Sequence, residues 1–200
     1  MNETLKRALS GAVYVAVMWI GTSYSETSFK LLFAILGLVC MYEIWKLRKG
    51  KTKIIAFLYI LIPLALVHKI DQEIILLMFV LTWTFDTFAY LLGVKFGKHK
   101  IMPSVSPKKS WEGFVGGFIF TVIAAYLTTN FSEIELNQAI AISLFLPFTA
   151  TIGDLIESHY KREAGVEDSG NFIPGHGGML DRMDAFMFTI PTLYIYLNLI

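Results

Sequence analysis

Long apolar segments constrain the fold of this chain more than any other feature. A window of about 20 residues, the length of helix that crosses a bilayer, marks seven segments. They cover about residues 8–24, 28–45, 54–67, 74–92, 113–129, 136–156 and 183–200. The chain has 55% hydrophobic and 16% charged residues, whereas soluble domains carry about 25% charged residues. We therefore predict an all-α integral membrane protein with about seven transmembrane helices, of which the short third segment is tilted, re-entrant or extended by its flanks.

The distribution of basic residues predicts the orientation in the membrane. If the N-terminus is cytoplasmic and every segment crosses once, 15 Lys and Arg residues are cytoplasmic and only Lys30 and Lys69 lie outside. The positive-inside rule expects such asymmetry. We therefore expect one polytopic domain over residues 1–200, with its active site facing the cytoplasm on two loops and the adjoining helix ends. As a separate expectation, the membrane is a bacterial cytoplasmic (inner) membrane.

Acids, bases and glycines gather between residues 153 and 184, although most of the flanking sequence is apolar. Asp154, Ser158, Lys161 and Arg162 follow the spacing of one helix face. A carboxylate can hold a divalent cation, and Lys and Arg side chains bind phosphate oxygens. The alternative interpretation is a solvated helix face with an Asp–Lys pair.

The second half of this stretch strengthens the functional interpretation. A glycine-rich turn over residues 170–178 can aim backbone N–H groups at an anion. Asp181 and Asp184 then follow at the start of the last apolar segment, where N-terminal capping is their alternative role. Two acids, Arg182 and this turn favour metal-assisted phosphoryl or nucleotidyl transfer. Three roles are open for His176: a general base, a hydrogen-bond donor to phosphate, or a side chain that fills the turn. No zinc-type spacing accompanies it.

A second cytoplasmic loop, residues 93–112, follows another acid-bearing segment. Asp86 lies within an apolar run, where a carboxylate is costly and therefore suggests function; an interhelical hydrogen bond is the alternative. Lys108 and Lys109 precede the fifth segment and are interpreted as an anion-binding entry or as membrane anchors. The glycines at 113, 116 and 117 predict close helix packing.

Together these residues resemble the signature of the phosphatidate cytidylyltransferase (CDP-diacylglycerol synthase) family. The resemblance covers about residues 80–190. It is carried by Asp86, Ala89-Tyr90, Phe96-Gly97-Lys98, the run Ser106–Gly113, Gly116-Gly117, Ser158, Lys161-Arg162, Asp168, Pro174, His176–Gly178, Asp181-Arg182 and Asp184.

The resemblance implies a multi-pass enzyme that joins CTP and phosphatidate to give CDP-diacylglycerol and pyrophosphate. It implies Mg²⁺ as a cofactor, with a monovalent cation such as K⁺ assisting, and a catalytic core over about residues 80–190. By position, Asp154 and Asp181 would hold the metal ion. The catalytic set would be Asp154, Lys161, Arg162, Asp181, Arg182 and Asp184, and the substrate-binding set Asp86, Lys108, Lys109, Ser158, Asn171, His176, Gly177 and Gly178.

Two departures from the family pattern stand out. Glu167 replaces the usual lysine, a charge reversal that would weaken triphosphate binding unless the side chain points to solvent. The chain of 200 residues is also short for the family, and we expect a short-form member.

We expect CTP, phosphatidate and membrane lipid as partners, no nucleic acid, and a homodimer because the spans are apolar all round. Two alternative functions remain open. One is a CTP-dependent enzyme of another lipid, either an isoprenoid-ether lipid cytidylyltransferase or a polyprenol kinase. The other is a transporter or channel that uses Asp86 and Asp154 as an ion path, although no matching pair of broken spans supports it.

Overall fold

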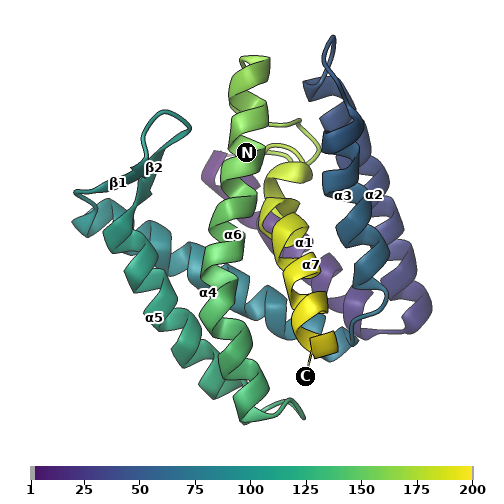
Figure 1. Ribbon diagram of the computed structural model, residues 1–200, viewed down its shortest axis with the longest axis vertical. Coiled ribbons are helices and arrows are strands. Elements are labelled where there is room, and N and C mark those ends of the chain that lie inside the picture. The colour runs from purple at the N-terminus through teal and green to yellow at the C-terminus, as the bar shows by residue number, and fades with distance from the viewer. Residues whose placement is uncertain (1–2, 200) are drawn as a thin grey trace.

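The computed structural model describes residues 3–199 as seven α-helices and one β-hairpin (Figure 1). The helices are α1 (Glu3–Ser23), α2 (Glu26–Leu47), α3 (Ile54–Val67), α4 (Gln72–Phe96), α5 (Trp111–Thr128), α6 (Leu136–Ala164) and α7 (Leu180–Leu199). Each predicted apolar segment corresponds to one helix, so the all-α prediction is confirmed. The largest difference in length is at α6, which continues to Ala164 instead of ending near residue 156.

Four of the described helices are long and apolar enough to cross a membrane, namely α2, α4, α5 and α6. The third helix, α3, is apolar but has only 14 residues, as the short third segment predicts. In α7, the charges of Asp181, Arg182 and Asp184 fall within the first two turns. Several candidate spans in one chain are the property of an integral membrane protein.

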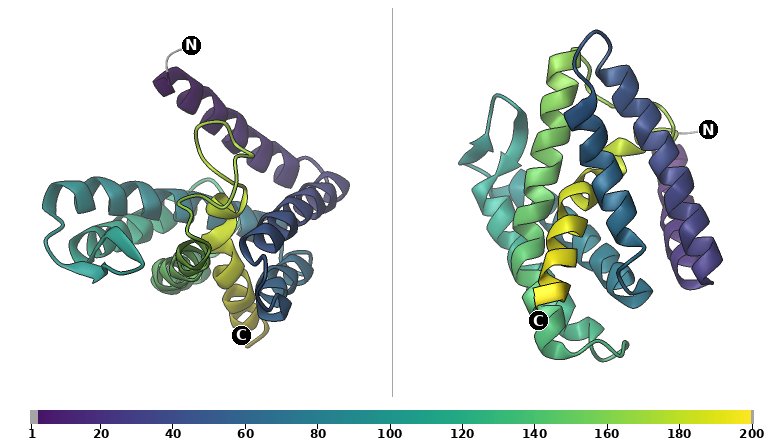
Figure 2. Two further views of the ribbon diagram at one scale, coloured as in Figure 1. Left: turned by 90° about the horizontal axis from the view of Figure 1, so that it is seen from above. Right: turned by 45° about the vertical axis from the view of Figure 1, so that its right-hand side comes forward.

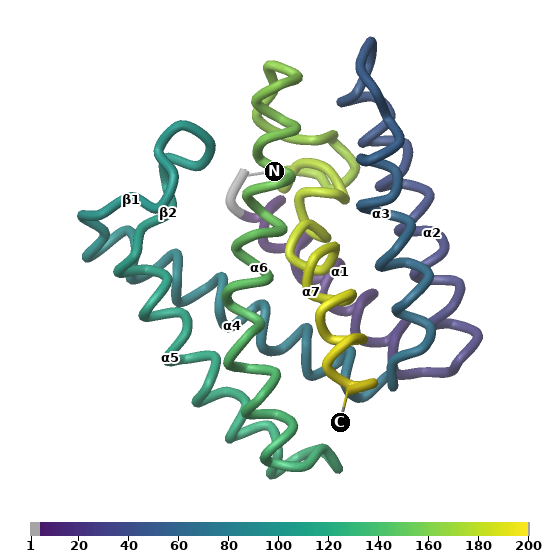
Figure 3. The backbone as a smooth tube through the Cα atoms, in the orientation of Figure 1, coloured from purple at the N-terminus to yellow at the C-terminus, as the bar shows by residue number. Residues whose placement is uncertain are grey.

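The helices bring distant parts of the sequence together at one end of the molecule. α4 packs along α5, and α6 packs against both α5 and α7. On the other side, α2 and α3 form a pair that contacts α7. The segment that joins α6 to α7 folds back over the start of α7 (Figure 3). Seen from above, it lies between α1 and α6 (Figure 2, left), and the Ser10 hydroxyl of α1 donates a hydrogen bond to the Pro174 carbonyl of this segment.

Small residues allow the close packing of α4 and α5. A Cβ atom on Gly117 would lie 2.8 Å from the Phe85 carbonyl oxygen, and one on Gly113 would collide with the Ala89 carbonyl oxygen. The predicted role of these glycines in helix packing is thus confirmed. A largely apolar core, which includes Phe33, Phe79 and Phe186, fills the space between the helices.

The loop between α4 and α5 forms a β-hairpin that the sequence pattern does not predict. Strand β1 (Lys100–Met102) pairs antiparallel with β2 (Ser106–Ser110), with a register shift between Lys100 and Met102. Ser110 ends β2 and caps α5, since its hydroxyl accepts a hydrogen bond from the Gly113 N–H at 3.2 Å. The hairpin therefore fixes Lys108 and Lys109 directly ahead of a helix start.

Candidate functional site

A cavity of about 470 Å³ lies where α4, the hairpin, α5, α6 and the start of α7 meet. Phe85, Ala89 and Phe114 contribute to its apolar wall. Its charged lining residues are Asp86, Lys108, Lys109, Asp154, Lys161, Asp168, Asp181, Arg182 and Asp184. Eight of these nine are predicted site residues, so the structure brings together groups that lie nearly 100 positions apart in the sequence.

Asp154 connects α6 to the hairpin. One carboxylate oxygen, Oδ2, lies 2.7 Å from the Lys109 ammonium, and the other, Oδ1, accepts a hydrogen bond from the Ser158 hydroxyl at 3.2 Å. Ser158 is buried and lines neither of the two cavities at the site, so it contacts the cavity only through Asp154. The predicted helical spacing of Asp154 and Ser158 is confirmed by this contact.

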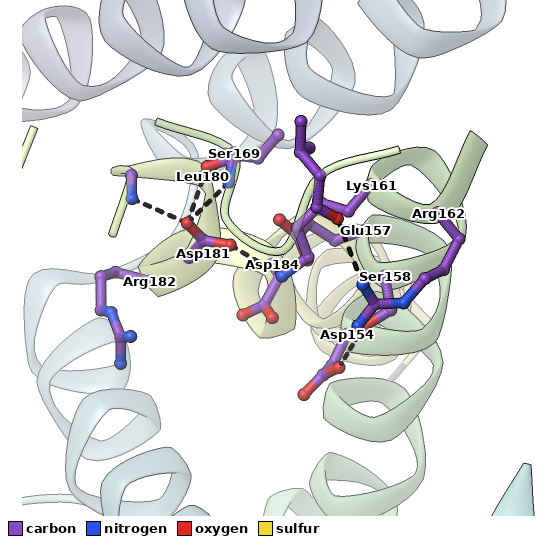
Figure 4. A network of polar contacts seen from close by, with 12 residues as sticks. Asp154, Glu157, Ser158, Lys161, Arg162, Ser169, Leu180, Asp181, Arg182 and Asp184 are labelled. Atoms are coloured by element: carbon purple, nitrogen blue, oxygen red, sulfur yellow. Dashed lines mark hydrogen bonds and ion pairs between the residues drawn. The ribbon is translucent and has the colours of Figure 1, made fainter. Parts of the chain in front are cut away.

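Lys161 is enclosed by two acids at the inner face of α6 (Figure 4). Its ammonium lies 2.7 Å from Asp181 Oδ1 and 2.6 Å from Glu157 Oε2. The exposed fractions of the side chains are 13% for Lys161, 6% for Asp181 and 0% for Glu157. Glu157 is absent from the predicted site; its position four residues before Lys161 on the same helix is the signal that identifies it.

Asp181 is held by the glycine-rich turn before α7. Its Oδ2 accepts hydrogen bonds from the Ser169 N–H at 3.0 Å, the Ser169 hydroxyl at 2.9 Å and the Gly178 N–H at 2.7 Å. The anion to which this turn donates is therefore a side chain of the protein itself.

Glu43 of α2 is a second buried acid at the same turn. Its carboxylate accepts hydrogen bonds from the Met179 N–H at 3.0 Å and the Leu180 N–H at 2.7 Å. The Ser169 hydroxyl lies 3.1 Å from its Oε2. The sequence assigns Glu43 no role, because an acid near the end of an apolar segment can extend to the membrane surface. In the structure the side chain points inward, and Glu43 is only 4% exposed.

A smaller cavity of about 240 Å³ adjoins the first between α1, α4 and α7. Its apolar lining includes Val15, Trp83 and Phe186. Both cavities share Asp86, Asp181, Arg182 and Asp184, so one charged centre separates two differently lined spaces.

His176 lines the smaller cavity from the side of the turn. Its Nδ1 lies 2.9 Å from the Ser10 hydroxyl of α1. Burial, Arg182 and Arg7 lower the pKa of His176, which favours the neutral imidazole near pH 7. Its backbone carbonyl accepts hydrogen bonds from the Arg182 guanidinium at 2.8 and 3.2 Å. This pair fixes Arg182 at the border of the two cavities.

Five predicted site residues line neither cavity, namely Ser158, Arg162, Asn171, Gly177 and Gly178. Arg162 is exposed and donates to the carbonyl oxygens of Val105 and Val166 at 3.4 and 3.2 Å. Asn171 is exposed and lines neither cavity. The predicted face of α6 therefore divides, because Lys161 turns inward to the acids while Arg162 turns outward to the hairpin.

Glu167 is also exposed and lines neither cavity. The charge reversal at this position therefore does not place a carboxylate in either space. An exposed Glu167 is the case in which we expect the charge reversal to leave triphosphate binding unchanged.

Curated relatives of the chain share a name. The chain is 46% identical to the phosphatidate cytidylyltransferase of Staphylococcus aureus over 125 residues. This aligned region covers 62% of this chain and 48% of the relative. It is 45% identical over 132 residues to that of Thermotoga maritima, with 62% of this chain and 49% of the relative covered. The chain thus spans about half the length of the curated relatives it matches.

A family model also matches most of the chain. The match extends over residues 53–200, from just before α3 to the C-terminus, and so includes the hairpin, α6 and the turn before α7. On this evidence, the chain belongs to the cytidylyltransferase family.

Proposed function

We propose that this protein is a phosphatidate cytidylyltransferase, which transfers the CMP group of CTP to phosphatidate and releases pyrophosphate. The observation that carries the proposal is the larger cavity, in which Lys108, Lys109, Lys161 and Arg182 meet Asp86, Asp154, Asp181 and Asp184. Lys108, Lys109 and Arg182 suit a triphosphate, and the acids suit a divalent cation bound with it. Membership of the family and the shared name of the relatives support the same reaction.

We assign the two substrates to the two cavities. The larger cavity, with Lys108 and Lys109 at its hairpin wall, suits the triphosphate of CTP. The smaller cavity has apolar walls that include Val15 and Trp83, and these suit the glycerol and upper acyl carbons of a lipid. Arg182 borders both spaces, and a guanidinium binds phosphate in a bidentate manner. A lipid phosphate and the α-phosphate of CTP would therefore meet at this residue.

In the proposed step, a phosphate oxygen of phosphatidate attacks the α-phosphorus of CTP. A new P–O bond forms, the bond from the α-phosphorus to the bridging oxygen breaks, and the electron pair leaves with pyrophosphate. A dianionic phosphate needs no general base, so the protein contributes by positioning the groups and neutralising charge. Lys108, Lys109 and Arg182 are the cations that we assign to this task.

The donor set fits a magnesium ion bound by few protein ligands. Within residues 3–199, no group of three or more His, Cys, Asp or Glu side chains is arranged to hold a metal ion. Mg²⁺ commonly takes only one or two carboxylates besides substrate phosphates and water. We propose Asp154 and Asp181 for this role, with Asp184 in support. Asp154 fits better, because each of its carboxylate oxygens has one contact, whereas Asp181 accepts three hydrogen bonds on Oδ2 and contacts Lys161 through Oδ1. When bound, the ion would neutralise phosphate charge, and K⁺ would assist as a monovalent cation.

The topology is part of the same proposal. We propose that all seven helices belong to one membrane domain with the N-terminus and both cavities on the cytoplasmic side, because the basic residues are so unequally distributed. The catalytic core would lie within about residues 80–190, and the protein would form homodimers in the bacterial cytoplasmic membrane.

The direct test is lipid labelling by the purified protein. In detergent with phosphatidate, Mg²⁺ and CTP labelled at the α-phosphate, we expect labelled CDP-diacylglycerol to form. When EDTA is included in the reaction, we expect no labelled lipid. No labelled lipid from folded protein would overturn the proposal for this acceptor. Isoprenoid-ether lipid and polyprenol acceptors, with separate assays for pyrophosphate and CDP, distinguish the other CTP-dependent reactions. Glu167→Lys, assayed in parallel, is expected to change the rate less than twofold because Glu167 lies outside both cavities.

A further inference from the structure

The buried carboxylate of Glu43 and the carboxylate of Asp181 hold opposite sides of one turn. Glu43 accepts hydrogen bonds from the backbone N–H groups of Met179 and Leu180, at the very start of α7. Asp181 accepts hydrogen bonds from the backbone N–H groups of Ser169 and Gly178. The Ser169 hydroxyl lies between the two acids, 3.1 Å from Glu43 Oε2 and 2.9 Å from Asp181 Oδ2. The position of Asp181 in the cavity thus depends on contacts that Glu43 completes.

The turn is shaped around the Glu43 carboxylate. A Cβ atom on Gly178 would lie 2.7 Å from both carboxylate oxygens of Glu43, and one on Gly170 would lie 2.5 Å from Oε1. A carbon atom cannot approach an oxygen so closely, so either the Glu43 carboxylate or the turn would have to move. Two of the glycines in the predicted anion-binding turn are therefore adjacent to this acid, and neither lines a cavity.

Helix packing alone does not account for an acid at this position. Within residues 3–199, no Lys, Arg or His side chain forms an ion pair with Glu43. Burying a carboxylate is costly unless hydrogen bonds compensate for the lost water. The compensation comes from the N–H groups and positive dipole end of α7. Glu43 is on α2, outside residues 53–200 that match the family model.

We propose that Glu43 is a positioning residue of the cytidylyltransferase reaction, which acts through the start of α7 and Ser169 to hold Asp181 at the larger cavity. The inference rests on the proposed function. It extends the working site to a helix of the N-terminal quarter of the chain. Glu43 itself lines neither cavity and contacts no substrate in this scheme.

The test compares Glu43→Gln with a control on the same helix. Glutamine keeps the shape of Glu43 but replaces one acceptor oxygen with an NH₂ group, so that either the Met179 or the Leu180 N–H loses its acceptor. We expect kcat per folded molecule to fall at least tenfold, while the KM for CTP changes less than twofold. Leu36→Ala removes a buried side chain of α2 and no hydrogen bond. It should lower the melting temperature without changing kcat.

A double variant tests the route through Ser169. If both residues act on Asp181, Glu43→Gln combined with Ser169→Ala should have a kcat within twofold of the slower single variant, because the second change removes a contact already lost. If the fold losses in kcat of the two single variants multiply in the double variant, the proposed route is overturned. A Glu43→Gln enzyme with the melting-temperature loss of Leu36→Ala and a normal kcat would overturn the positioning role.

Hydrogen exchange separates this inference from the proposed function. In the substrate-free protein, Glu43→Gln should increase amide exchange over residues 169–181 at least fivefold, and Leu36→Ala should not. If wild type forms no CDP-lipid but the exchange result holds, the proposed reaction is wrong and the contact of Glu43 with the turn stands. If exchange over residues 169–181 is unchanged in Glu43→Gln, Glu43 does not hold this segment and the inference is overturned.

Discussion

The Lys161 ammonium lies 2.7 Å from Asp181 Oδ1 and thereby joins the end of α6 to the start of α7 across a separation of 20 residues. The same ammonium contacts Glu157, so that two carboxylates share one cation in a nearly solvent-free space. Removing one partner of a buried ion pair leaves the other charge uncompensated and lowers the stability of the folded state. This ion pair is therefore the point at which a single substitution should affect both the turn and the cavity.

Asp181→Asn tests the acid at this point. The amide keeps one acceptor oxygen but turns an NH₂ group toward either Lys161 or the N–H donors of Ser169 and Gly178. In the lipid-labelling assay we expect turnover to fall by about 100-fold or more, a loss similar to that from removing one preorganised polar group from an active site. Asp71→Asn is the matched control, because Asp71 caps α4 away from both cavities and asparagine caps a helix equally well. Wild-type turnover in Asp181→Asn would contradict the assignment.

Lys109→Met tests the hairpin wall of the larger cavity. Methionine keeps much of the apolar stem but removes the ammonium 2.7 Å from Asp154 Oδ2, leaving that carboxylate without its cation. We expect kcat/KM for CTP to fall at least about tenfold, as for loss of a charge-assisted contact. Lys100→Met, an exposed change in the same hairpin that lines neither cavity, should have less than a twofold effect. Equal losses in the two variants would show that net charge, and not this contact, matters.

The sequence predicts the helices well because their signal is local. Each apolar segment corresponds to one helix, and the close approach of α4 and α5 follows from Gly113 and Gly117. The hairpin is missed because its strands are short, and Lys108 and Lys109 are themselves exposed or half-exposed. A short, polar strand lacks the alternation of apolar residues that identifies strands in a sequence.

The site residues are predicted only as far as their contacts are local. Asp154 and Ser158 meet because they are one helical turn apart. Glu43 and Asp181 meet through a turn 126 residues away from Glu43, which no periodicity reveals. Arg162 is a residue that the spacing wrongly assigns to the site. It follows Lys161 directly on α6, so its side chain leaves the helix in a different direction and contacts Val105. Spacing therefore finds the candidate groups, and tertiary packing decides which of them face the cavity.

His176→Gln tests the pH dependence of stability. Burial, Arg182 and Arg7 lower the pKa of His176 in the folded protein, so the unfolded chain binds more protons between the folded value and about 6.5. Stability should therefore rise with pH through this window and become independent of His176 above it. His68, whose pKa is lowered by burial and Lys30, adds to the same slope. In melting curves from pH 5 to 8, His176→Gln should reduce the slope and His176→Gln with His68→Gln should reduce it further; an unchanged slope in both would contradict the prediction.

Gly178→Ala tests the fit between the turn and Glu43. The added Cβ would lie 2.7 Å from both carboxylate oxygens of Glu43 and would also collide with the Ser169 hydroxyl. Either the Glu43 carboxylate and the Ser169 hydroxyl or the backbone of the turn must move, and each movement disturbs contacts at Asp181 Oδ2 or at the start of α7. We expect a lower melting temperature together with at least a tenfold loss of turnover. Gly50→Ala is the control, because Gly50 has a positive φ of 79° but an added Cβ would meet nothing within 4 Å among the described residues. It should lose only the stability that left-handed backbone strain costs, about 1 kcal/mol, and keep its turnover; normal turnover in Gly178→Ala would show that the turn tolerates displacement and that Asp181 does not depend on it.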